Sequence, residues 1–105
     1  MSWTCARCAV TVRWMPGNGE PQLPETWVEE NGGLYCLGCR RALAAEAELD
    51  AAPEDTPRSG RAKIRSRAML EFEVKRDPSR SNVEIARSVR ASVPAVQKAR
   101  DRLGV

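Results

Sequence analysis

Two pairs of cysteines constrain the fold of this chain more than any other feature of its sequence. Cys5 and Cys8 form one Cys-x-x-Cys pair, Cys36 and Cys39 form the second, and the chain has no other cysteine and no histidine. The two-residue spacing lets both sulfurs of a pair reach one tetrahedral ion, and four thiolates leave zinc no open position. The sequence therefore predicts one structural Zn²⁺ per chain, held by all four cysteines.

Three other uses of the cysteines stay open. Iron takes the same four ligands in a rubredoxin-like site. Two disulfides would need an oxidising compartment, whereas a redox-active Cys-x-x-Cys normally sits in a βαβ pattern that neither pair has. The stretch MSWTCARCAV contains no basic segment followed by an apolar core, so we expect no signal peptide and a reducing compartment.

The charge of the chain changes sign along its length. Residues 1–60 contain five Lys/Arg and nine Asp/Glu, whereas residues 61–105 contain twelve and five. The stretch DAAPEDTPRSG, at 50–60, has the composition of a linker. We therefore expect a zinc finger with a C-terminal helix at 1–50, a linker at 51–60 and a basic domain at 61–105, which is the part suited to a polyanion.

Local patterns before the linker predict a hairpin followed by a helix. The stretch TWVEENGGLYC, at 26–36, carries Asn31-Gly32 between two apolar pairs, and these two residues favour a tight hairpin turn. A helix is expected over 40–51, with Leu43, Ala47 and Asp50 on one face and Leu49 near it. The Pro- and Gly-rich residues 15–24 predict no regular structure.

The first half resembles treble-clef zinc fingers. The resemblance rests on CARC near the start, on the PETW…NGGLYCLGC hairpin and on a helix that begins at the last cysteine. It implies a knuckle and a hairpin that lead to a helix whose first turn carries the second ligand pair. DNA-binding members have a basic helix, but this helix carries Glu46, Glu48 and Asp50, so we expect the finger to serve folding and protein contact. A plain zinc ribbon is the alternative architecture.

The second half predicts three helices, at 61–77, 81–90 and 92–103. Ser81 and Glu84 have the spacing of a capping box, and Ser92 is suited to cap the third helix. The periodicity places one inward stripe on each helix. The expected inward residues are Ile64, Ala68 and Phe72, flanked by Leu70 and Val74, then Ile85, Ala86 and Val89, and finally Val96, Ala99 and Leu103.

The stretch NVEIARSVRASVPAVQKARDRL resembles the helix-turn-helix of bacterial and phage DNA-binding domains, in its three-helix form. Ile85 and Ala86 match the apolar and small positions of that motif, whereas Arg90 stands where the turn usually has glycine. The resemblance implies that the third helix enters the major groove of double-stranded DNA. The candidate DNA-binding residues are Arg80, Arg87, Ser92, Val93, Pro94, Gln97, Lys98, Arg100 and Arg102.

These expectations combine into a fold class and a function. We expect a small α+β zinc finger, with a hairpin and a helix, followed by an all-α three-helix domain. The function expected is sequence-specific DNA binding, as a transcriptional regulator in the cytoplasm of a bacterium or a phage-infected cell. A homodimer through the helix at 40–51, or a protein partner on the finger, is expected, and no membrane. The alternative is an adaptor of a larger nucleic-acid machine. No acid–base or nucleophilic centre is evident, so we expect no enzyme.

Overall fold

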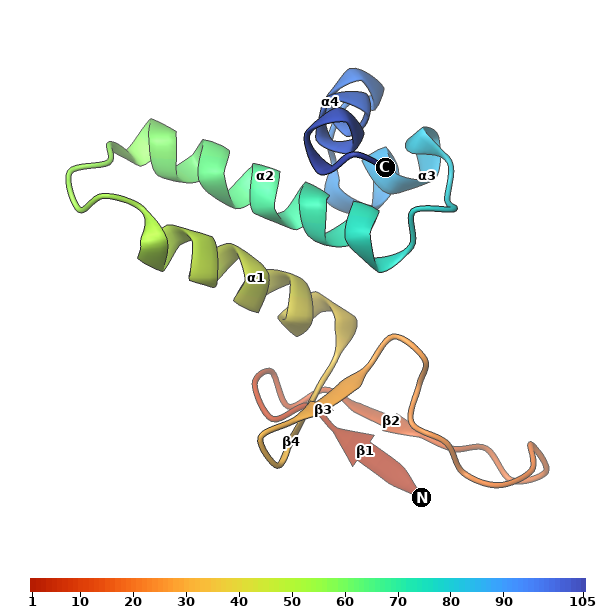
Figure 1. Cartoon of the computed structure of the whole chain (residues 1–105). Coiled ribbons are helices and arrows are strands. Elements are labelled where there is room, and N and C mark those ends of the chain that lie inside the picture. Colours follow the sequence, from red (N-terminus) through yellow and green to blue (C-terminus); the bar gives the residue numbers. More distant parts are fainter. The chain divides into compact units, whose positions relative to one another are not determined.

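The computed structural model describes all residues from 1 to 105, which divide into two compact units (Figure 1). The first unit, Met1–Arg40, contains two antiparallel hairpins and the first turn of helix α1. The second unit, Arg41–Val105, contains the rest of α1 and three further helices. The chain thus has a small α+β part with four clustered cysteines, followed by a helical part, which is the expected fold class.

The first unit begins with a hairpin that the sequence did not predict. Strand β1 (Ser2–Thr4) pairs with β2 (Thr11–Arg13), with Trp3 opposite Val12. Each strand has only three residues, too few for a clear alternation of apolar and polar side chains. The turn between the two strands carries the first cysteine pair.

The second hairpin confirms the prediction at 26–36. Strand β3 (Val28–Glu30) pairs with β4 (Gly33–Tyr35), with Val28 opposite Tyr35. Asn31 and Gly32 have φ angles of 50° and 79°. Both values lie in the left-handed region that a two-residue turn matching the twist of its strands requires, and Asn and Gly tolerate this region best.

The two hairpins of the first unit touch at the cysteine turn. The backbone N–H of Ala6 donates to the carbonyl of Leu34 over 2.7 Å. A Cβ on Gly33 would lie 3.3 Å from Cβ of Ala6 and 3.2 Å from the hydroxyl of Tyr35. The absence of a side chain at Gly33 therefore lets β4 approach the cysteine turn.

The second unit is built on helices that largely match the predicted spans. Helix α1 (Leu37–Ala51) is followed by α2 (Arg58–Arg76), α3 (Asn82–Val89) and α4 (Val93–Leu103). Ser81 and Ser92 cap α3 and α4 by accepting from the backbone N–H groups of Glu84 and Ala95. Both caps were expected, because a serine oxygen satisfies a backbone N–H that has no partner in the first helical turn.

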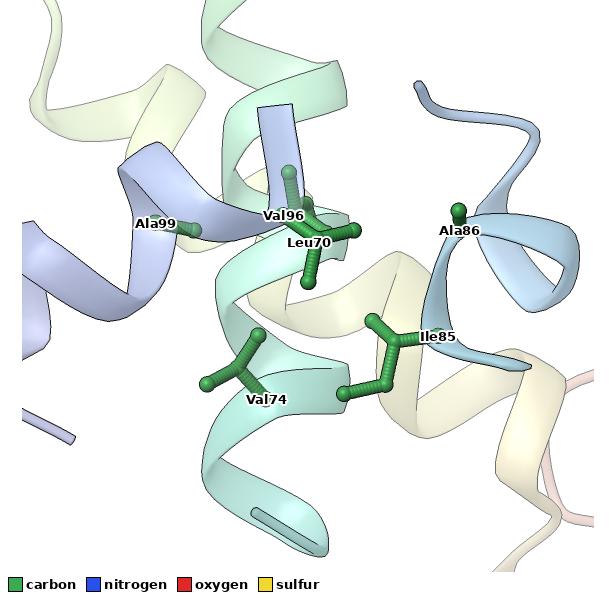
Figure 2. Packing of buried hydrophobic residues seen from close by; sticks show 6 residues of the cluster. All are labelled: Leu70, Val74, Ile85, Ala86, Val96 and Ala99. Atoms are coloured by element: carbon green, nitrogen blue, oxygen red, sulfur yellow. The ribbon is translucent and has the colours of Figure 1, made fainter. Parts of the chain in front are cut away.

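The core of the second unit lies where α2, α3 and α4 meet. Its buried residues are Leu70, Val74, Ile85, Ala86, Val96 and Ala99, and Figure 2 shows these six side chains in the space between the three helices. Val74, Ile85, Val96 and Ala99 have no exposed surface. The inward positions predicted on α3 and α4 are therefore confirmed, apart from Val89 and Leu103, which are only partly buried at the edge.

The predicted face of α1 was wrong at Leu43, Ala47 and Asp50, although Leu49, expected near it, is buried. Leu43 retains 38% of its surface exposed, and Ala47 and Asp50 are exposed as well. The buried positions are Ala45 and Leu49. The helix is so rich in alanine that several faces are nearly equal in apolar content, so its own pattern does not select one of them.

Candidate metal centre and basic helical surface

The four cysteines come together from three separate places in the first unit. Cys5 and Cys8 lie at the turn between β1 and β2, Cys36 follows β4, and Cys39 lies in the first turn of α1. All four Sγ atoms lie within 4.8 Å of one another. The Sγ atoms of Cys8 and Cys36 are 3.7 Å apart. A tetrahedron with metal–sulfur bonds of about 2.3 Å has edges of about 3.8 Å, so the arrangement fits one tetrahedral ion.

Backbone hydrogen bonds shape the two loops that carry the cysteines. The N–H of Cys36 donates to Sγ of Cys5 over 3.5 Å, and the N–H of Cys5 donates to the carbonyl of Val10 over 2.9 Å. The N–H of Ala9 donates to the carbonyl of Cys5 over 3.0 Å, which closes the first loop. Ala9 reaches this position with φ at 64°, a conformation that favours glycine.

The pKa values of the two buried thiols, Cys5 and Cys39, are shifted in opposite directions. Burial tends to raise the pKa of Cys5, but backbone N–H groups of Cys8, Cys36 and Arg7 outweigh this and lower the pKa to about 6. Burial raises the pKa of Cys39 to about 12, helped by the three neighbouring thiols. Four negative sulfurs at this separation repel one another, so a bound cation is needed to keep all of them ionised.

The donor set defines what this centre can do chemically. Four sulfurs complete a tetrahedral shell and leave no position for a water or a substrate. Cys5 and Cys39 are buried and Cys36 is half-buried, whereas Cys8 is exposed. The cluster could therefore hold one metal ion as a structural centre that ties two loops and a helix start together.

The predicted DNA-reading residues are exposed on α4. Ser92, Val93, Pro94, Gln97 and Lys98 all lie on its solvent side, whereas Val96 faces the core. The side-chain amide of Gln97 donates to Asp101 over 3.0 Å and accepts from Asn82 over 3.3 Å. These two contacts hold the amide in one orientation.

The predicted phosphate contacts fall into two groups. Arg87 is exposed on α3. Arg80, Arg100 and Arg102 instead have partners within the second unit. Arg100 donates to Asn82, to the carbonyl of Pro78 and to the carbonyl of Arg80 over 2.6, 2.9 and 2.7 Å. Arg102 lies 3.5 Å from a carboxylate oxygen of Glu71.

A buried carboxylate at Glu73 was missed by the sequence reasoning. Glu73 has no exposed surface and accepts hydrogen bonds from three guanidinium groups, those of Arg41, Arg76 and Arg80. Burial tends to raise its pKa, but the hydrogen bonds from Arg41 and Arg76 outweigh this and lower it. The sequence did contain a signal for this burial: Glu73 lies three residues after Leu70, and this spacing places it on the inward side of α2.

Comparisons with protein-family models, curated proteins and solved structures find no match to the chain. The assignment of a function therefore depends on the residues and their geometry. No helix combines the length and the apolar character needed to cross a lipid bilayer.

Proposed function

We propose that this chain is a sequence-specific double-stranded DNA-binding protein that regulates transcription. The observation that carries the proposal is the pairing of α3 with α4. Three residues, 90–92, connect the two helices, both helices begin at a serine cap, and the small Ala86 is buried between them. These features support the assignment of a helix-turn-helix, a motif whose second helix reads the major groove.

The conformation of the turn supports this assignment. Arg90 ends α3 with φ at 54° and ψ at 42°, in the left-handed region where such turns usually place glycine. The N–H of Ala91 donates to the carbonyl of Ala86 over 2.9 Å and closes the turn. Arg90 thus adopts the backbone conformation that glycine usually supplies at this position, at the cost of a strained residue.

The exposed face of α4 supplies the chemistry for reading bases. An amide such as that of Gln97 can form two hydrogen bonds with adenine, and Lys98 can bind guanine or a phosphate. Because Asn82 and Asp101 hold Gln97 in place, less conformational entropy is lost on binding. Arg87 is free to contact a phosphate, which positions the protein without reading sequence.

For the first unit, we propose that the four cysteines hold one Zn²⁺ with a structural role, in a treble-clef-like finger. Thiolate ligands suit zinc, and a closed shell serves folding and not catalysis. Iron remains the competing ion, because it uses the same ligands. Elemental analysis of protein purified without added metal distinguishes the two.

The test of DNA reading starts from the full-length, metal-loaded chain and a pool of random duplexes. An enriched sequence is expected, and Gln97→Ala should reduce the preference for it over a scrambled duplex by about 1–3 kcal/mol, because one bidentate contact is lost. Arg87→Ala should weaken binding to both duplexes equally. If no sequence is enriched, or if Gln97→Ala leaves the preference unchanged, α4 does not read DNA, and the adaptor role becomes the better proposal.

A further inference from the structure

A groove in the second unit lies beside the proposed reading helix. It has a volume of about 550 Å³ and is bordered by the N-terminal half of α2, by the turn after α3 and by α4. Five cationic side chains line it and no acidic one does. They are Lys63 and Arg67 on α2, Arg90 in the turn, and Lys98 and Arg102 on α4.

Most of this positive charge is not neutralised within the chain. Lys63, Arg90 and Lys98 form no ion pair in the structure. Arg67 and Arg102 approach the same carboxylate, that of Glu71, at 3.6 and 3.5 Å. Because concave walls of one sign concentrate the electrostatic field, the groove is suited to an anion.

The other lining groups indicate which anion the groove fits. The hydroxyls of Ser66 and Ser92 border it and can donate hydrogen bonds to anionic oxygens. Its apolar lining consists of small alanines together with Leu70, which is only 5% exposed, and the half-buried Val89. An acidic segment of a partner protein is the competing occupant, and the continuity of the groove with the exposed face of α4 favours DNA over it. A phosphodiester strand needs only cations, donors and shape.

We propose that this groove binds the phosphodiester backbone of the same duplex that α4 reads, an inference that rests on the proposed function. Ser92 and Lys98 line the groove and also belong to the exposed reading face of α4, so the two surfaces are continuous. Lys63 and Arg90 then contact phosphates. Neither residue was among the DNA-binding residues predicted from the sequence, whereas Arg80 and Arg100, which were, donate to groups within the protein.

Neighbouring residues on α2 provide matched controls. Arg61 and Arg65 are exposed on the same helix and carry the same charge as Lys63, but they do not line the groove. Glutamine replaces each cation in the test, because it removes the charge and keeps a long side chain. At position 90 glutamine also leaves a residue with a Cβ in the left-handed turn, so the backbone requirement is unchanged.

The experiment measures duplex affinity of the full-length, metal-loaded protein as a function of salt concentration. The slope of log affinity against log salt is negative, and Lys63→Gln and Arg90→Gln should each make it less steep by about 0.9, as expected for one phosphate contact each. The double variant should make it less steep by about 1.8. Their preference for the enriched duplex should not change. Arg61→Gln and Arg65→Gln should leave the slope unchanged, and circular dichroism verifies that every variant is folded.

The outcomes separate this inference from the proposed function. If the enriched duplex is still preferred but the groove variants behave like the two controls, the groove proposal is wrong and the DNA-reading proposal stands. If no duplex is preferred over another, both proposals fall. A polyglutamate peptide serves as a competitor. If the peptide displaces the duplex at a concentration below that of the duplex, and if this displacement is lost in Lys63→Gln and Arg90→Gln, the groove would be assigned to an acidic protein instead.

Discussion

Each of the two units of this chain is stabilised by a different kind of internal interaction. In the first unit, Met1–Arg40, the only buried apolar residues are Cys5 and Cys39, both candidate metal ligands. In the second unit, nine apolar residues are buried, and six of them form one continuous core. A module of this size that lacks an apolar core needs another source of stability. Hydrocarbon packing therefore stabilises the second unit, whereas we expect the first unit to depend on bonds from its four clustered cysteines to the proposed metal.

The aromatic residues make the comparison directly measurable. Trp3, Trp14 and Trp27 all lie in the first unit, where Trp3 and Trp14 contact each other edge to face with ring centroids 6.3 Å apart. The second unit contains no tryptophan and holds most of the helical residues. Tryptophan fluorescence therefore reports the first unit, and the helical signal in circular dichroism mainly reports the second.

Removal of the proposed metal should cause the largest loss of stability of all the changes considered, and this loss should be confined to the first unit. Structural zinc in small fingers contributes about 10–16 kcal/mol to folding at neutral pH, so a strong chelator should unfold the first unit. Tryptophan emission should shift to longer wavelength while most of the helical signal remains. Cys36→Ser should reproduce the effect. A chelated protein whose tryptophan spectrum is unchanged would show that the first unit folds without metal.

Removal of a core side chain should give the reverse pattern. Ile85 has no exposed surface, and Ile85→Ala should destabilise the second unit by about 3–4 kcal/mol through lost burial and a remaining cavity. Val83→Ala, at a position that is 47% exposed on the same helix, should change stability by less than about 0.5 kcal/mol. Urea unfolding followed by circular dichroism measures both values. A tryptophan transition that moves together with the helical one would contradict independent units.

Glu73→Gln removes a buried negative charge and should destabilise the second unit by about 3 kcal/mol. A neutral amide cannot balance three guanidinium groups, and breaking a buried ion pair costs about this much. The comparison variant is Glu71→Gln, because Glu71 is 21% exposed and its pairs are longer. Equal destabilisation by the two changes would show that burial of Glu73 has no special effect.

The lowered pKa of Glu73 also predicts a pH dependence. Its contribution is fully present above the unfolded-state pKa, about 4.3, and is lost as the pH falls through the lower folded-state value. The helical unit should therefore lose stability below about pH 4 in the wild type. The loss should be smaller in Glu73→Gln, which has no carboxyl to protonate. Urea unfolding at several acidic pH values, followed by the helical signal, measures this difference.

Glycine substitutions at strained residues should give the smallest effects, one in each unit. Ala9 and Arg90 have φ angles of 64° and 54°, which cost a residue with a Cβ about 1–2 kcal/mol, whereas glycine adds an entropic cost of about 0.5–1 kcal/mol. Ala9→Gly should thus make the tryptophan signal more resistant to chelator, and Arg90→Gly should raise the midpoint of helical unfolding, each by up to about 1 kcal/mol. A decrease in either case would mean that the side chain itself contributes a stabilising contact.

Local sequence was sufficient for part of this fold. The left-handed turn at Asn31 and Gly32, the serine caps at Ser81 and Ser92, and the inward positions on α3 and α4 were all predicted. The clustering of the four cysteines was predicted as well. For the turn, the caps and the helix faces, the preference depends on residues within a few positions of one another, through backbone φ angles, capping hydrogen bonds or helical periodicity. The cysteine cluster was predicted differently, from the four ligands that one tetrahedral ion requires.

Only the tertiary structure decided which surfaces face each other. The pairing of β1 with β2, the choice of Ala45 and Leu49 as the buried face of α1, and the burial of Glu73 all depend on groups distant in sequence. The same holds for the cations: Arg80 and Arg100 find carboxylate or carbonyl partners, whereas Lys63 and Arg90 remain unpaired beside one groove. A guanidinium is attracted equally by a phosphate and by a carboxylate of its own chain, so the sequence names the charge and only the fold determines which partner lies within reach.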